Sequence, residues 1–461
     1  MNAGTNINIY NLPAPVREIM ARLERGGFRS YLVGGVVRDY IQGRVPKDYD
    51  IATIATPDQV RRLFPRVIPS GLKHGTVKVI EGGLEIEVTT LRRDGRYSDC
   101  RRPDGVEFTF SLREDLSRRD FTINSLAADI GGRVYDFFGG LKDIAGGIIR
   151  AVGDPGKRFR EDGLRMMRAI RFACQMKFVV ESVTLNSIRS NRRLISRVSM
   201  ERIRDELNGI LMSEMPREGV DLLFWCGLMD HILPYLADLA AVEKEAGTKG
   251  IYSRTLDVLS DSPARLNVRL AALLHCAAGL DGPGACAAGK GRLKRRRQEA
   301  PGTVEEMISR LKYDRRTAAS VLELVGMCNA WRFLSGEKEI KRFLGCVGAG
   351  NIEDVFDLWT AHARASGGAG DEESIWVLRS SMESILAKKA PVSIKDLALN
   401  GNDLKRMGIR PGRDMGLILD RLLEAVLDRP EVNERPLLME MVREWSGIID
   451  KLEEERRTKE K

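Results

Sequence analysis

The sequence predicts an α+β protein: a small mixed sheet with helices near the N-terminus, followed by helical domains. Two observations lead to this fold class. Up to about residue 150, short β-rich runs such as RSYLVGG (29–35) and LEIEVTT (84–90) alternate with helical patterns. From about Asp154 onward, helical periodicity dominates, with Gly and Pro between the segments. A strand-rich head joined to a helical remainder is typical of separate domains.

The elements of the head follow from local patterns. Four apolar residues with helical spacing predict a first helix that stops near Gly27: Val16, Ile19, Met20 and Leu23. DYDIAT (48–53) predicts a strand, and TPDQVRRLF (56–64) predicts a helix with Thr56 as its cap. HGTVKVI (74–80) and the LEIEVTT run are separated by EGG, which is typical of a hairpin. Residues 94–105, DGRYSDCRRPDG, are polar and rich in turn-forming residues, so we expect a mobile loop.

Composition narrows the class of protein without identifying it. The formal charge is +9, which suits a polyanionic partner, although many basic proteins bind no nucleic acid. Seven cysteines are scattered without a CxxC pair, so neither a zinc site nor a disulfide framework is expected. The sequence has no long apolar run and no secretory signal pattern. We expect a cytoplasmic protein with reduced cysteines and no membrane association; oligomeric state is not indicated.

Two aspartates in the second predicted strand suggest a metal site. Asp48 and Asp50 are two residues apart, so on a strand both side chains would point to one face. Glu87 lies on the predicted polar face of the 84–90 strand and is a candidate third carboxylate. Clustered carboxylates repel one another unless a cation neutralises them, and Mg²⁺ prefers such oxygen ligands. We therefore expect Mg²⁺ on Asp48 and Asp50. With Glu87, the three carboxylates could hold two metals, or hold one metal and assist deprotonation of an attacking hydroxyl.

A glycine turn and an arginine precede these aspartates. Gly34 and Gly35 end a predicted strand and lead into VVRDYI, which is expected to start a helix. Exposed backbone N–H groups at such a turn can bind phosphate, and Arg38 lies three residues into the helix. A Gly-Gly pair or a DxD pair alone is commonplace. Their combination within twenty residues is far more specific for nucleotide chemistry.

A second polar pattern lies downstream, in FREDGLRMMRAIRF (159–172). Four charged residues recur every three positions and are expected on one helix face: Asp162, Arg165, Arg168 and Arg171. Taken alone, this pattern also fits a solvated ion-pair face. Alternatively, Asp162 accepts from the exocyclic amine of cytosine or adenine while Arg165 donates to ring acceptors. Uracil and guanine present the opposite pattern, and each unmet buried hydrogen bond costs about 1–3 kcal/mol.

Together these motifs resemble the class II tRNA nucleotidyltransferase and bacterial poly(A) polymerase family. LVGGVVRDYIQGRVPKDYDIAT resembles the first motif, and DLSRRDFTINSLA (115–127) is similar to the second nucleotide-binding motif. Residues 135–173 resemble the stretch from head into neck, and the segment from LALNGNDLKRMGIRPGRD onward resembles the C-terminal region of long bacterial CCA-adding enzymes. The resemblance implies base selection by Asp162 and Arg165. It also implies nucleotide contacts from further residues: Arg119, Asp120, Asn124, Arg168 and Arg171.

The resemblance implies a polymerase-β-like catalytic head followed by helical neck, body and tail. The expected boundaries are a head at 1–150, a neck at 151–215, a body at 216–390 and a tail at 391–461. A basic segment at 279–303, containing RLKRRR, is expected to be a flexible insertion or an additional RNA contact. The expected partners are tRNA, held by its acceptor and TΨC arms, and the nucleotides CTP and ATP.

Several activities share this architecture. The full loop at 94–105 argues against an enzyme that adds only CC, and residues 65–76 lack the basic pattern typical of bacterial poly(A) polymerases. Addition of C, C and A to tRNA is therefore the expected activity. An A-adding enzyme, a poly(A) polymerase and a non-catalytic RNA-binding protein stay open as alternatives.

The body contains a sequence similar to the start of an HD-type phosphohydrolase domain. Here His275 is followed by Cys276 rather than Asp, and the sequence shows no cluster of further histidines around it. We expect a degenerate helical module in which His275 is a core or cap residue.

Overall fold

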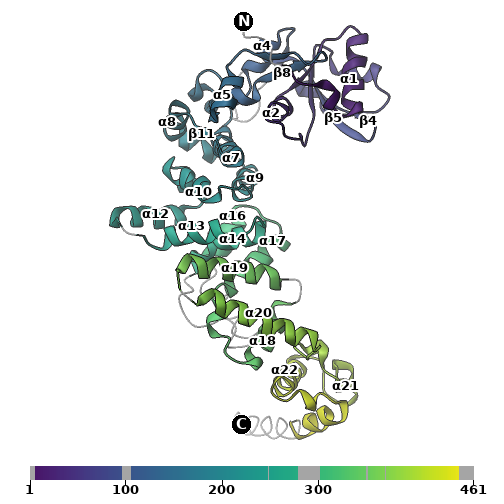
Figure 1. The fold of residues 1–461 in the computed structure, drawn as a ribbon. Coiled ribbons are helices and arrows are strands. Elements are labelled where there is room, and N and C mark those ends of the chain that lie inside the picture. Colours follow the sequence, from purple (N-terminus) through teal and green to yellow (C-terminus); the bar gives the residue numbers. More distant parts are fainter. Residues whose placement is uncertain are drawn as a thin grey trace, which may run out of the picture. The chain divides into compact units, whose positions relative to one another are not determined.

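The computed structural model describes residues 6–95, 105–247, 249–278, 302–348, 351–368 and 370–445. The chain divides into two compact units. The first comprises Met1–Ala246 with Arg310–Lys312, and the second comprises Gly247–Ser309 with Tyr313–Lys461. Figure 1 shows the mixed sheet in the N-terminal part of the chain and helices in the remainder, as predicted. In the described ranges, no helix is long and apolar enough to cross a membrane.

In its described residues the head contains the strands of the main sheet, a separate two-stranded sheet of β6 and β7, and five α-helices. Its elements are α1 (Ala14–Arg25), β1 (Ser30–Val33), α2 (Gly35–Ile41), β2 (Asp50–Thr53), α3 (Pro57–Leu63), β3 (Val67–Gly71), β4 (Thr76–Glu81), β5 (Leu84–Thr90), β6 (Arg92–Asp94), β7 (Val106–Phe108), α4 (Leu112–Ser117), β8 (Leu126–Asp129), β9 (Val134–Asp136) and α5 (Gly140–Gly146). The rest of the first unit is mainly helical: β10 (Ile148–Ile149), α6 (Pro155–Glu161), α7 (Arg165–Met176), β11 (Val179–Val180), α8 (Ser182–Asn191), α9 (Met200–Leu211), α10 (Pro216–Trp225), α11 (Met229–Ile232) and α12 (Pro234–Ala246).

From residue 247 onward the described elements are helices. The α-helices are α13 (Ile251–Asp261), α14 (Leu266–Leu274), α16 (Gly302–Arg310), α17 (Arg315–Met327), α18 (Glu337–Val347), α19 (Ile352–Ser366), α20 (Asp371–Ala387), α21 (Gly401–Arg406) and α22 (Arg413–Asp428). Short 3₁₀ helices along the whole chain are η1 (Ile9–Asn11), η2 (Leu72–His74), η3 (Thr122–Asn124), η4 (Arg192–Arg197), η5 (His275–Ala278), η6 (Ala330–Phe333), η7 (Ile394–Asp396) and η8 (Pro430–Val432).

The head sheet has the strand order β3-β4-β5-β2-β1-β8-β9. β4 and β5 form the predicted antiparallel hairpin, and β2 pairs with β5 in parallel. Alternate residues of the strands face a core covered by α1, α2 and α3; for example, Leu32, Ile51 and Val88 are almost fully buried there. The opposite face packs Val33 and other strand residues against α4. The capping box at Thr56 also forms as predicted.

Two local predictions need correction. β2 begins at Asp50, so Asp48 lies just before the strand rather than on it. The expected single helix face from Asp162 to Arg171 is also wrong. α6 ends at Glu161, Asp162 has an extended backbone, and α7 begins only at Arg165. The break requires a glycine, because a Cβ on Gly163 would lie 2.8 Å from the Leu194 carbonyl oxygen.

Other predictions fall outside the described residues. The 94–105 loop lies largely in the undescribed range 96–104, and the basic insertion lies mostly in 279–301. The finer domain boundaries stay predictions.

The second unit buries its own core, which includes Trp359 packed against Phe343 with ring centroids 5.1 Å apart. The His275 ring lies edge-to-face against His362, with centroids 4.3 Å apart. The sequence had indicated no partner for His275, because His362 lies far along the chain. Among the described residues, no group of three His, Cys, Asp or Glu side chains could hold a metal ion.

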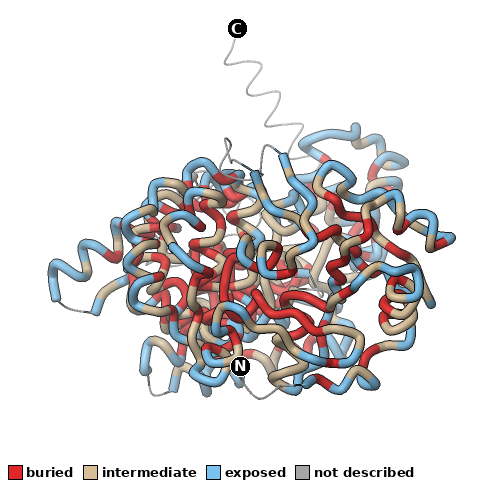
Figure 2. The backbone as a smooth tube through the Cα atoms, turned by 90° about the horizontal axis from the view of Figure 1, so that it is seen from above, coloured by how far each residue is buried: buried red, intermediate tan, exposed pale blue. Residues whose placement is uncertain are grey.

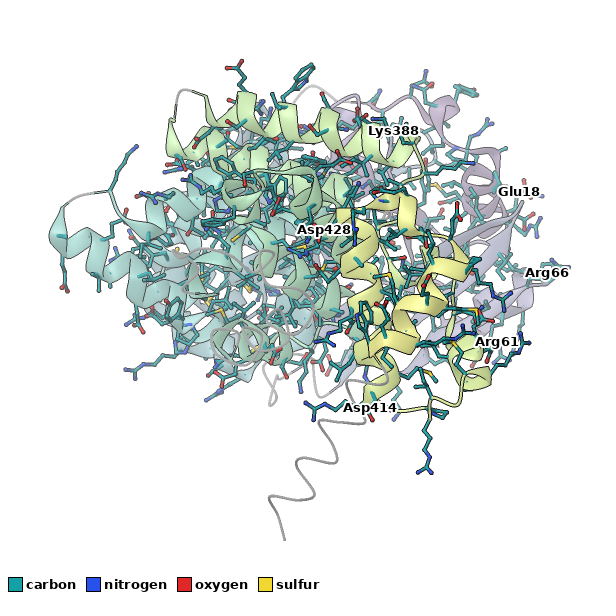
Figure 3. All side chains as sticks on the ribbon, turned by 90° about the horizontal axis from the view of Figure 1, so that it is seen from below. Glu18, Arg61, Arg66, Lys388, Asp414 and Asp428 are labelled. Atoms are coloured by element: carbon teal, nitrogen blue, oxygen red, sulfur yellow. The ribbon has the colours of Figure 1, made fainter. Side chains whose placement is uncertain are left out.

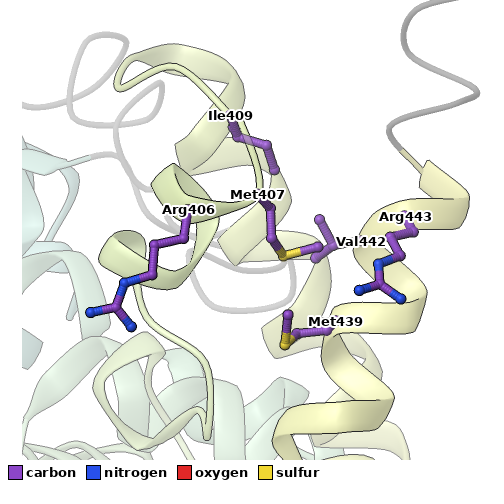
Figure 4. A pocket seen from close by; sticks show the side chains of 6 residues that line it. All are labelled: Arg406, Met407, Ile409, Met439, Val442 and Arg443. Carbon is purple, nitrogen blue, oxygen red and sulfur yellow. The ribbon is translucent and has the colours of Figure 1, made fainter.

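Burial follows the elements within each unit, with buried residues along their inner sides (Figure 2). Many charged side chains lie at the surface; Arg61 and Arg66 of the head and Asp414 of α22 extend outward in Figure 3. The tail has a small apolar core that includes Leu399, Leu422 and Leu438. A shallow hollow beside this core is lined by Arg406, Met407, Ile409, Met439, Val442 and Arg443 (Figure 4).

Candidate nucleotidyltransferase site

Three predicted carboxylates lie on or beside two central strands of the head sheet, β2 and β5. Asp50 and Glu87 are register partners in the parallel pairing of β2 with β5. Because Ile51 and Val88 face the main core, their neighbours Asp50 and Glu87 share the opposite face. Asp48, just before the strand, is exposed and acts electrostatically on Asp50. We call Asp48, Asp50 and Glu87 the carboxylate edge.

The carboxylate edge carries excess negative charge. Although part of the Asp50 surface meets solvent, burial by surrounding protein and the charge of Glu87 raise its pKa to about 6. Asp48 adds to this effect and Arg119 opposes it. The three side chains do not form a three-ligand metal group. The donor chemistry nevertheless fits a hard divalent cation, because neighbouring carboxylates disfavour one another's ionised form until a cation neutralises them.

The predicted glycine turn lies between β1 and α2. Gly34 is the N-cap of α2 and has φ 78°, a conformation that favours glycine. A Cβ at Gly34 would also lie 2.8 Å from the Arg119 Nη1 atom. The turn thus brings the backbone close to an arginine that acts on Asp50. The Nε of Arg119 is buried without a hydrogen-bond partner, while its Nη2 is 3.5 Å from Asp115.

A hydrogen-bonded chain leads from the turn into the neck. Arg38 Nη1 donates to Asn124 Oδ1 at 2.6 Å, and Asn124 Nδ2 donates to Asp120 Oδ1 at 3.2 Å. Arg168 then donates to the other Asp120 oxygen, from Nε at 2.9 Å and from Nη2 at 2.7 Å. Burial acts to raise the pKa of Asp120, but Arg168 and Arg165 outweigh it and lower the pKa to about 2.

The arginines of this region surround one phenyl ring. The guanidinium carbons of Arg38, Arg168 and Arg171 lie 5.4, 5.2 and 4.2 Å from the centre of the Phe172 ring. Glu206 of α9 accepts from Arg171 Nε at 2.6 Å and lies 3.8 Å from Arg168 Nη1. Its carboxylate is buried, so it balances two of the three cations.

The two predicted base-selecting residues lie at the break between α6 and α7, and both have protein partners. Asp162 accepts from Arg202 of α9, with Nη2 to Oδ2 at 2.7 Å and Nη1 to Oδ1 at 3.3 Å. Arg165 donates from Nη1 to Glu161 at 2.7 Å and from Nη2 to the Arg118 carbonyl at 3.1 Å. Thus α6, α7 and α9 hold these side chains together.

The structure therefore connects Arg38, Asn124, Asp120 and Arg168 through direct hydrogen bonds, whereas Asp162 and Arg165 are held by other partners. Sequence reasoning missed four residues that contact the predicted ones: Glu161, Phe172, Arg202 and Glu206. A local signal existed for Glu161, which stands beside Asp162 and four residues before Arg165. Arg202 and Glu206 lie some 40 and 35 residues from their partners, and no local spacing reveals such pairs. We call Asp120, Asp162, Arg165, Arg168, Arg171, Arg202 and Glu206 the paired cluster.

A basic surface lies next along the chain. Four exposed arginines occur on α8 and η4: Arg189, Arg192, Arg193 and Arg197. The Arg189 guanidinium stacks 4.3 Å from the ring of Trp225, which is 44% exposed. Cations interleaved with an exposed aromatic ring suit the backbone and bases of RNA.

Comparison with known proteins identifies two regions of the first unit. Residues 30–150 match the poly A polymerase head domain, which contains the carboxylate edge and the glycine turn. Residues 177–239 match a family described as "Probable RNA and SrmB- binding site of polymerase A", which contains the basic surface.

Relatives match over nearly the whole chain. The CCA-adding enzyme of Ligilactobacillus salivarius is 32% identical over 94% of this chain and 97% of its own. That of Levilactobacillus brevis is 34% identical over 92% of this chain and 96% of its own. Among solved structures, the Bacillus stearothermophilus CCA-adding enzyme in complex with CTP has a TM-score of 0.71 and 29% identity, covering 94% of this chain and 98% of that one. This chain belongs to the family of CCA-adding enzymes.

Proposed function

We propose that this chain adds C, C and A to the 3′ end of tRNA, using CTP and ATP without a nucleic-acid template and releasing pyrophosphate. The observation that carries the proposal is that one part of the first unit holds both a register pair of carboxylates, Asp50 and Glu87, and a hydrogen-bonded series from Arg38 through Asn124 and Asp120 to Arg168, on the same helix as Arg165. One end suits phosphoryl chemistry and the other offers base-reading groups. Membership of the CCA-adding family supports the same activity.

In this proposal the carboxylate edge holds Mg²⁺. Asp48 and Asp50 are the ligands; burial and the charge of Glu87 raise the pKa of Asp50, and a bound cation would favour its ionised form. When bound, Mg²⁺ lowers the pKa of the terminal 3′-hydroxyl and neutralises charge on the phosphates. Glu87 lies in register with Asp50 and assists removal of the hydroxyl proton.

The nucleotide lies between the glycine turn and the paired cluster. Gly34, Gly35 and Arg38 bind the phosphates, since the turn lies at the N-terminus of α2 and Arg38 supplies a fixed cation. Further contacts to the nucleotide come from Arg119, Asp120, Asn124, Arg168 and Arg171. Asp162 accepts from the base amine and Arg165 donates to the ring, which favours cytosine and adenine over uracil and guanine.

The tRNA binds through its phosphates and shape. The basic helical regions, which include the exposed arginines of α8 and η4, hold the acceptor and TΨC arms. Action on tRNA is consistent with the cytoplasmic location that the sequence indicates.

The decisive experiment measures incorporation by the full-length protein. Three tRNA substrates, ending at the discriminator base, at C and at CC, are each incubated with CTP alone, ATP alone and both. We expect CTP to extend the first substrate by two nucleotides and the second by one, and ATP alone to extend only the third. Asp48→Ala is the inactive control.

The alternatives give different products. An A-adding enzyme extends only tRNA ending in CC, and a poly(A) polymerase leaves a ladder of A residues beyond the first. A non-catalytic RNA-binding protein binds tRNA without Mg²⁺-dependent turnover. Absence of CTP incorporation, or full activity in the Asp48→Ala variant, overturns the proposal.

A further inference from the structure

The head exposes two phenyl rings at the end of its two-stranded sheet. Phe108 is the last residue of β7 and is 49% exposed, and Phe110, two residues later, is 85% exposed. A single exposed apolar side chain is ordinary in a folded protein. Two neighbouring aromatic rings left in water are less ordinary, because burial of such rings is strongly favourable. They therefore suit contact with a partner.

The turn that carries Phe110 is held in place by hydrogen bonds. The Thr109 N–H donates to the Leu91 carbonyl at 2.9 Å, and the Thr109 hydroxyl donates to Glu114 Oε2 at 2.6 Å. The N–H of Ser111, which is the N-cap of α4, donates to the Thr109 hydroxyl at 3.1 Å. Both neighbours of Phe110 are thus tied to the fold. A partner that binds here needs little ordering of the backbone.

Phe108 lies close to the carboxylate edge. A Cβ on Gly75 would lie 2.7 Å from Phe108 Cε1 and 3.4 Å from Thr90 Cβ, so the ring rests on the Gly75 backbone beside β5. Thr90 is the third residue after Glu87 on this strand, a separation of about 10 Å at the usual rise of a strand. The aromatic turn therefore begins about 10 Å from a carboxylate of the edge.

The aromatic turn also adjoins the base-selecting side of the site. Phe108 is the register partner of Arg92, whose Nε lies 3.4 Å from Asp94. Arg118 Nη1 lies 3.9 Å from the same carboxylate, and the Arg118 carbonyl accepts from Arg165. The two rings are therefore near both the place of phosphoryl chemistry and the place of base selection.

Exposed cations accompany the rings along the chain. Lys73 of η2 lies two residues before Gly75, and Arg113 of α4 lies three residues after Phe110; both are exposed. Aromatic rings stack with bases, and nearby cations neutralise phosphates, so this combination suits a single-stranded nucleic acid. It suits an apolar protein surface less well.

The 3′ end of the tRNA is the nucleic acid that must reach this place. In the proposed reaction its terminal hydroxyl reacts at the carboxylate edge. Stacked nucleotides advance about 3.4 Å each, so a distance of about 10 Å corresponds to roughly three nucleotides. The sequence of this end changes as nucleotides are added. A stacking surface tolerates such change, because every base has a π-face.

We infer that Phe110, with Phe108 beside it, is a stacking platform for the single-stranded 3′ end of the tRNA. The inference rests on the proposed function and adds a contact with the acceptor RNA that the predicted motifs do not supply. The platform holds the RNA and does not choose the incoming nucleotide. Removing the Phe110 ring therefore weakens binding of tRNA and leaves binding of the nucleotide unchanged.

The test is steady-state addition of A from ATP to tRNA ending in CC. In Phe110→Ala we expect KM for tRNA to rise about 5-fold to 100-fold, with kcat and KM for ATP changed less than threefold. Phe110→Trp keeps an aromatic ring and should stay within threefold of wild type. Phe110→Leu keeps an apolar side chain without the ring, so its KM for tRNA should lie between wild type and Phe110→Ala.

Tyr10→Ala is the matched control. Tyr10 is 77% exposed and follows Ile9, which packs against the main core on the other face of the sheet. Its KM for tRNA should equal that of wild type. Thermal melting is measured for every variant, and the exposure of Phe110 predicts unchanged melting for its substitutions.

Three modified tRNAs show whether the ring meets a base. Each ends in CC but lacks the base at one of its last three positions. If Phe110 stacks on one of these bases, wild type binds that abasic tRNA more weakly, and Phe110→Ala causes no additional loss on it. On the other two substrates the loss caused by Phe110→Ala should persist.

The remaining outcomes overturn the inference. An unchanged KM for tRNA in Phe110→Ala does so, as does an equal loss on the unmodified and all three abasic substrates. If wild type sediments as a dimer and Phe110→Ala as a monomer with unchanged KM, the rings form a contact between copies. If wild type adds no nucleotide, the proposed function fails, and direct binding of the same tRNAs to wild type and Phe110→Ala decides on the platform separately.

Discussion

The carboxylate edge and the paired cluster lie in the same unit but differ in how their carboxylates are neutralised. At the edge, like charges lie together and the pKa of Asp50 rises to about 6. In the cluster, each carboxylate has an arginine partner, and the pKa of Asp120 falls to about 2. An edge with uncompensated charge favours an external cation, whereas internally paired groups keep fixed positions. The comparison therefore suits the carboxylate edge to metal binding and the paired cluster to recognition of the base.

The largest expected effect comes from removing a charge at the edge. Asp50→Asn or Asp48→Asn should lower CTP incorporation on the order of 10³-fold or more, because a bound metal supplies several kcal/mol of transition-state stabilisation. Folding should be unchanged or slightly more stable, because a like charge is removed. Incorporation assays and thermal melting measure both effects.

Glu85→Gln is the control for the edge. Glu85 lies on the same strand face as Glu87 but pairs with Lys78 at 3.0 Å. It should retain nearly full activity. If Glu85→Gln lost as much CTP incorporation as Asp50→Asn, activity would depend on the total negative charge of this region and not on specific metal ligands.

The second effect concerns selection at the paired cluster. Asp162→Ala removes the acceptor for the base amine, so discrimination of CTP over UTP should fall roughly 10-fold to 100-fold. The Mg²⁺ concentration needed for half-maximal activity should stay the same. Parallel titrations of nucleotide and Mg²⁺ measure the two responses. If Asp162→Ala changed the half-maximal Mg²⁺ concentration but not the preference for CTP over UTP, Asp162 would act in metal binding rather than in base selection.

The third effect is on stability. The pKa of Asp120 is lowered from 3.8 to about 2, so its charge stabilises the fold at pH values above the unfolded pKa. This stabilisation is lost as pH falls through the folded pKa. Relative to Asp120→Asn, wild type should therefore hold a pH-dependent advantage of roughly 2 kcal/mol at pH 7, constant to about pH 5 and shrinking below pH 4.

Urea unfolding of both chains between pH 7 and pH 3 measures this advantage. Arg61→Gln, an exposed arginine of α3, should leave the profile unchanged. A wild-type advantage that stays constant down to pH 3 would mean that the buried pair with Arg168 does not lower the pKa of Asp120.

The comparison also shows which features the sequence reveals. Alternation in LEIEVTT correctly predicted that Ile86 and Val88 are buried and Glu87 is not, because a strand repeats every two residues. The helix break at Asp162 was missed, although Asp-Gly is a common turn signal. There the three-residue repeat of charges was the more conspicuous pattern.

Contacts between side chains that lie far apart in the sequence could not be predicted from the sequence. Arg202 with Asp162, and His362 with His275, join residues whose separation has no periodic signature. Their proximity depends on how helices pack, and a single sequence does not state this packing. The chemically active groups were therefore easier to predict than the residues that orient them.

The smallest expected effect comes from Glu87→Gln, which tests whether Glu87 is a metal ligand. Glu87 lies in register with Asp50, yet the edge does not form a three-ligand metal group. Glu87→Gln should therefore lower incorporation by about tenfold or less, since it removes assistance in proton transfer rather than a metal ligand. Half-maximal Mg²⁺ should rise less than threefold in Glu87→Gln, whereas excess Mg²⁺ should not restore Asp50→Asn. A loss in Glu87→Gln as large as that in Asp50→Asn would make Glu87 a third ligand and move the boundary of the metal site onto β5.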